Sequence, residues 1–297
     1  MNRARAWSAW SHWRVTIVGV LAAGALLTGC LAAPAASGPG PSPAGRSHAG
    51  DSPAGPDGAR SPSARPTTRP ARRKPLAGKV VGIDPGHNGR NGTDPAYLTH
   101  QIFNGRSMED CNTTGTQTAG GYTESLFNWK VATYLTADLR RDGARVVLTR
   151  HNNHGIGPCV NKRSWMLNHT NVAIDIHADG GPTWGRGFTV LEPVADGPNN
   201  AVIGSSLRFG RYVRAAFLAD TPLRVSNYYG RNGYIFRNDL AGLNLTTVPK
   251  VLIECGNMTN GADAALLTSP HVQRQIAWAL EAAIIRFLTG RWPSRTA

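Results

Sequence analysis

Two histidines and a glutamate are the residues of this sequence best suited to chemistry. His87 follows the run Val80–Gly86, whose apolar residues and final Asp-Pro-Gly predict a buried strand ending in a sharp turn. His177 likewise ends an apolar run, Val172–Ile176. Open α/β sheets place their sites at such strand ends. Together with Glu124, and with a fourth position left to water, the two imidazoles form a zinc-binding set suited to hydrolysis.

Glu124 is the first residue of a predicted helix that runs to about Arg141. Apolar residues recur there at helical spacing, and basic residues followed by Gly143 indicate its end. A glutamate in a first helical turn is most often a solvent-exposed partner of the helix dipole. A metal-binding role for Glu124 therefore depends on the two strand-end histidines.

Glu254 lies inside another predicted strand, the apolar run Pro249–Cys255. A carboxylate in a buried strand is unfavourable unless it is paired or functional. Burial can lift its pKa toward neutrality, which suits a general base beside a metal-bound water. A structural ion pair with a neighbouring arginine is the alternative.

Strands and helices alternate along the rest of the globular part. Further strands are predicted at 144–149 and 187–191, and further helices at 160–168, 201–218 and 270–288. This alternation predicts an α/β fold: a single domain with a largely parallel, twisted sheet and helices on both faces.

Residues 88–121 separate two of the candidate ligands and are rich in Asn, Gly and Thr. Loops of this length in compact domains are usually functional or disordered. We expect this stretch to lie over the site, either as a lid or autoinhibitory flap or as a surface insertion held by Cys111. His151 and His154 lie in a polar loop without an orienting element, so we do not expect them to be ligands.

The amino-terminal quarter differs in composition from the rest. Basic residues precede an apolar run, Val15–Leu27, that is too short to span a membrane, so residues 1–30 are predicted to be a signal peptide. Leu27–Cys30 resembles a bacterial lipoprotein box, in which Cys30 becomes acylated; ordinary cleavage within 32–36 is the alternative. Residues 31–78, mostly Pro, Ala, Gly, Ser and Arg, predict a disordered tether, before a catalytic domain at 79–290 and a tail at 291–297.

The formal net charge of +14 is concentrated in that leader and tether. Ten basic and only two acidic side chains fall within residues 1–78, which leaves about +6 for the remainder. The tether lacks aromatic residues interleaved with basic ones, and secretion removes the usual polyanion, so nucleic acid is not an expected partner. Anionic lipid or wall polymer is the simpler partner for a basic tether.

Four cysteines remain to be assigned in an oxidising compartment. If Cys30 is acylated, three are left. Cys255 falls inside an apolar strand and is expected to be a buried thiol. Cys111 and Cys159 both lie in loop segments and are the expected disulfide.

Four motifs together resemble the zinc-dependent N-acetylmuramoyl-L-alanine amidases of the amidase-3 type, in an actinobacterial short form. They are Ile83–His87, Glu124 at the start of a helix, Ile176–Asp179, and Pro249–Gly256 with Asn260. The resemblance covers about residues 79–288. It implies zinc ligands at His87, Glu124 and His177 and a catalytic carboxylate at Glu254.

The resemblance also implies a reaction, cleavage of the amide that joins muramic acid to the L-alanine of the peptidoglycan stem peptide. Zinc would lower the pKa of its water to about 7 and polarise the carbonyl. Glu254 would then accept the water proton and return it to the leaving amine. Asp84 and Asp175 are close enough in sequence to the ligands to orient them, or they bind turn amides instead.

The sequence departs from the family at two positions and leaves two rival functions open. Asp175 stands where the family commonly has serine, and Asn257 where it often has phenylalanine, so substrate specificity is in question. A zinc carboxypeptidase-like peptidase would use the same side chains, and a non-catalytic wall-binding lipoprotein would keep them as a relic. A monomer without a separate wall-binding domain is expected.

Overall fold

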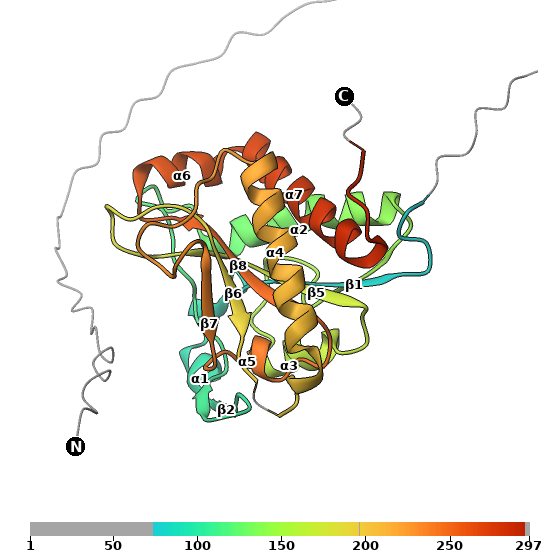
Figure 1. Cartoon of the computed structure of the whole chain (residues 1–297). Coiled ribbons are helices and arrows are strands. Elements are labelled where there is room, and N and C mark those ends of the chain that lie inside the picture. Colours follow the sequence, from blue (N-terminus) through green and yellow to red (C-terminus); the bar gives the residue numbers. More distant parts are fainter. Residues whose placement is uncertain (1–73, 196, 295–297) are drawn as a thin grey trace, which may run out of the picture. The chain divides into compact units, whose positions relative to one another are not determined.

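The computed structural model describes residues 74–195 and 197–294 (Figure 1). The expected signal peptide, Cys30 and nearly all of the expected tether lie outside the described residues. Six strands form one sheet in the order β4-β1-β5-β8-β6-β7. Their bounds are β1 Val80–Pro85, β4 Arg145–Leu148, β5 Val172–Asp179, β6 Thr189–Pro193, β7 Tyr234–Arg237 and β8 Lys250–Asn257.

The sheet is mixed, with a parallel half that carries the predicted site. Strands β4, β1, β5 and β8 run parallel to one another. Strand β6 pairs antiparallel with β8, and β7 runs parallel to β6. The prediction of an α/β fold with a largely parallel sheet is confirmed, and the antiparallel β6–β8 pair is a detail that the sequence pattern did not indicate.

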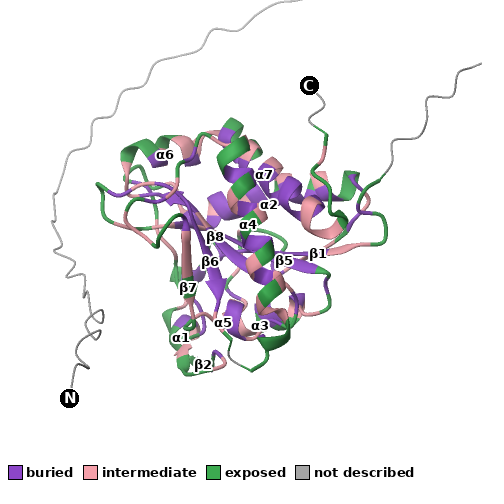
Figure 2. Ribbon diagram, viewed as in Figure 1, coloured by how far each residue is buried: buried purple, intermediate pink, exposed green. Residues whose placement is uncertain are grey.

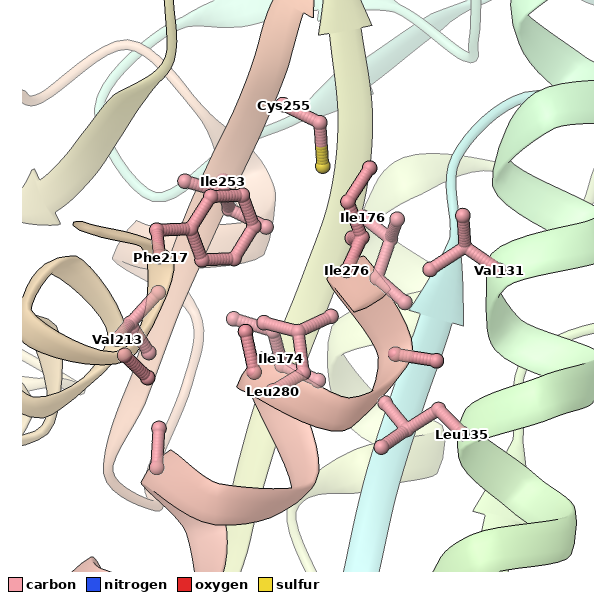
Figure 3. Packing of buried hydrophobic residues seen from close by; sticks show 14 of the residues in the cluster. Val131, Leu135, Ile174, Ile176, Val213, Phe217, Ile253, Cys255, Ile276 and Leu280 are labelled. Atoms are coloured by element: carbon pink, nitrogen blue, oxygen red, sulfur yellow. The ribbon is translucent and has the colours of Figure 1, made fainter. Parts of the chain in front are cut away.

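One face of the sheet is covered by three long helices, α2 Glu124–Arg141, α4 Ile203–Asp220 and α7 Pro270–Thr289. Val131 of α2 points toward Ile176 of β5, and Phe217 of α4 lies beside Ile253 of β8 (Figure 3). All these side chains are fully buried. Each of the three helices has buried residues on one side and exposed residues on the other (Figure 2).

The opposite face carries the short helices α3 Val160–Leu167 and α5 Ala241–Asn244. Leu167 packs with Ala173 of β5 in a small cluster, and Leu243 packs with Leu252 of β8 in another. Because side chains alternate along a strand, Leu252 and Glu254 share this face while Ile253 faces the long helices. Helices therefore cover both faces, as predicted.

Residues 88–121 contain short elements that the sequence did not predict. They are a 3₁₀ turn η1 Asn91–Thr93, helix α1 Pro95–Thr99, and a hairpin of β2 Gln101–Phe103 and β3 Met108–Asp110. A Cys111–Cys159 disulfide joins this insertion to the start of α3, and Cys255 is a buried free thiol, so both cysteine predictions are confirmed.

The remaining elements of the described chain are the 3₁₀ turn η2 Asn200–Val202 before α4, and helix α6 Gly261–Thr268 before α7. Helix α7 starts at Pro270 and ends at Thr289, and the capping residue Gly290 adopts the left-handed conformation with φ 74°. Across residues 74–195 and 197–294, every helix is too short or too polar to serve as a membrane span.

Candidate metal centre

The carboxyl ends of three parallel strands bring the predicted site residues to one edge of the sheet. His87 follows β1, and His177 and Glu254 are directly paired in the β5–β8 register. Glu124 reaches the same edge from the first turn of α2. The strand ends of a parallel sheet meet at one edge, so residues far apart in the sequence meet there.

His87, Glu124 and His177 converge on one point. Nε2 of His87 lies 3.1 Å from Oε2 of Glu124, and Nδ1 of His177 lies 2.8 Å from Oε1. The candidate ligand atoms of the three residues all lie within 4.8 Å of one another. The two imidazole rings stand edge to face, with centroids 4.9 Å apart. The structure therefore brings together the three residues that the sequence singled out.

The carboxylate of Glu124 is held by neighbours on three sides. The backbone N–H of Thr116 donates to Oε2 at 3.0 Å, and that of Ala178 donates to Oε1 at 3.3 Å. The side chain of Asn128, one helical turn further along α2, also donates to Oε1 at 3.3 Å. We had not predicted a role for Asn128. The sequence does offer an indication of this role, because Asn128 is a polar residue four positions after Glu124 and therefore lies on the same, core-facing side of the helix.

His87 adopts an unusual backbone conformation. Its φ of 57° lies in the left-handed region, which residues other than glycine rarely adopt. Nδ1 lies 3.1 Å from the carbonyl oxygen of Thr113, to which it can only donate, and this fixes Nε2 as the nitrogen facing Glu124. Such an imidazole, oriented by a carbonyl behind it, is the usual arrangement of a metal-binding histidine.

Two buried arginines hold the turn that carries His87. Arg163 of α3 donates to the carbonyls of Pro85 at 2.9 Å and His87 at 2.7 Å. Arg150, after β4, donates to the carbonyls of Pro85 at 2.8 Å and Gly86 at 3.2 Å. Both guanidiniums thus donate to backbone oxygens of the strained turn and hold it from behind.

Asp84 and Asp175 do not touch the histidines that they were expected to orient, and they do not bind turn amides. Asp84 pairs with Arg163 at 2.5 Å and accepts from Thr149 at 2.5 Å. Asp175 lies 2.9 Å from Nζ of Lys250. The prediction failed because both side chains point to the α3 and α5 face, where buried cations meet them. Asp84 acts on the site only through Arg163, which also holds His87.

The charges within the site shift each other's ionisation. Burial alone would raise the pKa of Glu124, but the two imidazoles outweigh it, so the pKa of Glu124 lies well below its usual value. Burial alone would lower the pKa of His87, but the negative charge of Glu124 reverses this and raises it. Glu124 is therefore a carboxylate, the form in which it binds a cation.

Glu254 faces a cavity of about 240 Å³ that is also lined by His87, Glu124 and His177. Its Oε2 is buried and has no hydrogen-bond partner among the described residues. Burial raises the pKa of Glu254 well above its usual value, and the charges of Glu124 and Asp179 raise it further. The nearby guanidinium of Arg237 hydrogen-bonds Asp239 and Tyr229 instead, so the geometry does not favour a structural ion pair for Glu254.

The insertion at residues 88–121 packs directly against the candidate ligands. A Cβ added to Gly115 would lie 2.7 Å from both Oε2 of Glu124 and Cδ2 of His87, so only glycine fits there. Together with Thr113 and Thr116, this places one end of the insertion over the site, as expected.

Other histidines and one departure from the family lie away from the three ligand candidates. His151 and His154 are exposed and lie outside the group that gathers around Glu124. His100 lies near Cys111 and Cys159, but the disulfide ties up both sulfurs. Asn257, one of the two departures from the family, holds the loop after β5 by donating to the carbonyls of Pro182 and Gly185, each at 2.8 Å.

The donor set fits a zinc ion. Two imidazole nitrogens and a carboxylate oxygen are the ligands of catalytic zinc sites, which keep one position open. Here the remaining side is the cavity next to Glu254. The buried carboxylate of Glu124 and the carbonyl behind His87 are the surroundings that a cation at this position requires.

Known proteins are similar to this chain in both sequence and fold. A model of the N-acetylmuramoyl-L-alanine amidase family, Amidase_3, matches residues 81–286. N-acetylmuramoyl-L-alanine amidase Rv3717 of Mycobacterium tuberculosis is 41% identical over 224 residues, which is 74% of this chain and 90% of that protein. The crystal structure of the amidase Ami1 from Mycobacterium smegmatis matches with a TM-score of 0.68 and 39% identity, over 73% of this chain and 99% of that one.

The apo form of Ami1 from Mycobacterium abscessus gives the same TM-score of 0.68, with 40% identity over 72% of this chain and 100% of that one. The matched residues contain α2, β5, β8 and all of β1 except its first residue, and they include all four candidate site residues. The family match covers most of the chain. The 41% identity to the Mycobacterium tuberculosis relative indicates common family membership and not only a similar fold. The chain therefore belongs to the N-acetylmuramoyl-L-alanine amidases of the amidase-3 type.

Proposed function

We propose that this protein hydrolyses the amide bond between N-acetylmuramic acid and the L-alanine of the peptidoglycan stem peptide, with zinc held by His87, Glu124 and His177. The observation that carries the proposal is the convergence of the three side chains within 4.8 Å, beside a cavity into which Glu254 also faces. The amidases of mycobacteria named above support the choice of bond.

Zinc bound by these residues would act as a Lewis acid toward the amide carbonyl and lower the pKa of a water in the cavity. The chain's own part begins with Glu254, whose unpartnered Oε2 is free to take up a proton. A raised pKa suits a base that works near neutral pH, because it binds the proton of water and can release it again to the leaving amine.

The surrounding residues would keep the ligands in place during this cycle. Asn128 and the backbone N–H groups of Thr116 and Ala178 hold the Glu124 carboxylate. The Thr113 carbonyl fixes the orientation of the His87 ring. Preorganised ligands of this kind need not rearrange when substrate binds, which lowers the barrier.

The location in the cell follows from the substrate and from the leader. Peptidoglycan lies outside the cytoplasmic membrane, so the enzyme would act in the cell envelope. The sequence of residues 1–30 supports export as a lipoprotein acylated at Cys30, with residues 31–78 as a tether. Labelling with a fatty acid analogue, compared between the natural chain and Cys30→Ala, tests the anchor.

The activity is tested by digesting purified muropeptides and identifying products by mass spectrometry, with the zinc content of the same preparation measured by elemental analysis. Release of intact stem peptides together with one zinc per chain is the expected result. Stepwise loss of terminal residues would instead identify a carboxypeptidase. If the zinc-loaded protein releases no product, the non-catalytic wall-binding function is the alternative that remains.

A further inference from the structure

Arg237 is the only arginine or lysine among the described residues that line the cavity of the candidate metal centre. It is the last residue of β7, the edge strand beside β6, and is paired with Pro193 in the register. Its positive charge is close enough to Glu254 to lower the pKa of that carboxyl group, against the larger effect of burial. No step of the proposed hydrolysis uses this guanidinium.

Two neighbours hold the guanidinium in one orientation. Nε donates to Oδ1 of Asp239 at 2.6 Å and Nη2 donates to Oδ2 at 2.5 Å, a parallel pair of bonds. Nη1 donates to the hydroxyl of Tyr229. An arginine has five N–H donors, so these contacts leave two, one on Nη1 and one on Nη2. Held in this way, the guanidinium of Arg237 is a preoriented fork with two N–H groups that Asp239 and Tyr229 do not use.

Stability alone does not explain this arrangement. The side chain of Asp239 is 56% exposed and that of Arg237 is 26% exposed, and ion pairs in such positions contribute little to folding. The consequence of the Arg237–Asp239 pair is that the positively charged guanidinium of Arg237 keeps a fixed position at the cavity. A fixed guanidinium matches the two oxygens of a carboxylate and binds it without first losing rotamer freedom.

The expected substrate offers such a carboxylate at a suitable distance. In a stem peptide, the residue after L-alanine is acidic, and its free carboxylate is the anionic group nearest the scissile amide. An extended residue spans at most about 3.6 Å, so that carboxylate lies within about 7 Å of the amide. Glu254 and Arg237 both line the same cavity of about 240 Å³.

We propose that Arg237 forms a carboxylate-binding subsite that reads the acidic second residue of the stem peptide and disfavours its carboxamide form. Asp239 and Tyr229 are positioning residues for this fork. The inference rests on the proposed amidase function and adds to it a preference between two substrates. A carboxamide presents one oxygen and an N–H₂ group, which cannot accept from the guanidinium in the same way.

The test compares two small substrates with the zinc-loaded full chain. They are N-acetylmuramoyl-L-alanyl-D-glutamic acid and its D-isoglutamine analogue, in which the α-carboxylate is a carboxamide. The natural chain is expected to have the higher kcat/KM on the acid. Arg237→Gln should lower kcat/KM on the acid roughly 10- to 100-fold, the range for losing a hydrogen bond to a charged group, and change it less than about threefold on the amide. Arg237→Lys keeps the charge but not the fork. Its kcat/KM on the acid should lie between those of the natural chain and Arg237→Gln.

The matched control is Arg231→Gln, which removes the same charge from an exposed residue that does not line the cavity. It should leave the ratio of the two kcat/KM values unchanged. Asp239→Asn, which frees the fork, should raise KM for the acid more than it lowers kcat.

The outcomes separate the subsite from the function on which it rests. Equal cleavage of both substrates by the natural chain, or an acid preference that survives in Arg237→Gln, would overturn the subsite and leave the amidase intact. A loss of preference in Arg231→Gln would also overturn it, because the effect would then be one of overall charge. Failure of the natural chain to cleave either substrate would overturn the amidase itself.

Discussion

Replacing Gly86 by alanine tests the ligand role of His177 through the geometry of the strand end. Gly86 is not among the residues with positive φ, so its backbone conformation accepts alanine. An added Cβ, however, would lie 2.7 Å from Nδ1 of the His177 ring and closer still to two other ring atoms. Ordinary van der Waals contact begins at 3.4 Å, so Nδ1 alone would have to recede by 0.7 Å, and the two closer atoms require a larger movement of the ring.

A shift of this size is large for a catalytic site. A misplacement of about 1 Å lowers the rate roughly 10²-fold, which corresponds to about 2.7 kcal/mol. We therefore expect kcat/KM of Gly86→Ala to fall roughly 10²-fold. A ligand pushed from its position should also weaken zinc binding, by roughly 10- to 100-fold if the effect resembles the loss of an orienting partner.

The assay measures zinc per chain by elemental analysis, muropeptide cleavage by chromatography, and the fold by circular dichroism. Gly204→Ala in α4 is the control, because an added Cβ there meets no atom within 4 Å, and it should keep full zinc and full activity. If Gly86→Ala retains the fold, the zinc content and the turnover of the natural chain, His177 is not a ligand in the way argued above.

Three further predictions concern the base and the stability of the fold. Glu254→Gln should keep its zinc and lose turnover roughly 10²- to 10⁴-fold; unchanged muropeptide cleavage would exclude Glu254 as the base. Asp84→Asn leaves the buried Arg163 unpaired and should lower the free energy of unfolding by about 3–5 kcal/mol in urea at pH 7. Burial raises the pKa of Asp84, but Arg163 and other partners outweigh it and lower the pKa from 3.8 to about 2. This stabilisation is therefore present above pH 3.8 and is lost as the pH falls toward 2, where the urea midpoints of the two proteins should converge. Replacing Cys111 and Cys159 by serine removes a link across 48 residues and should cost about 4 kcal/mol by the chain-entropy model; an unshifted urea midpoint would contradict that model.

The sequence predicts the features of this fold that are encoded locally. Apolar runs ending at His87 and His177, and the helical stripe that begins at Glu124, each place a candidate ligand at the end of an element. Because parallel strands share one edge, these local patterns were sufficient to predict that the three residues meet. Their gathering in the structure agrees with this expectation.

Features that depend on distant partners were not predictable in the same way. Arg163 reads as an ordinary charged residue of a helix, yet it is 1% exposed and bonds the carbonyls of a turn more than 70 residues earlier. The direction of β6 depends on how the chain returns to the sheet, which no local period encodes. Short elements such as β7 and α5 give too few residues for a period to be counted.

The strand order has a consequence for how the centre matures. His87, Glu124 and His177 come from β1, α2 and β5, and Glu254 comes from β8, so the four meet only after crossover connections have closed across much of the domain. A nascent or half-folded chain offers an ion only scattered side chains. Capture of the ion would thus be a late event, and its free energy of binding would stabilise the finished fold without guiding the route to it.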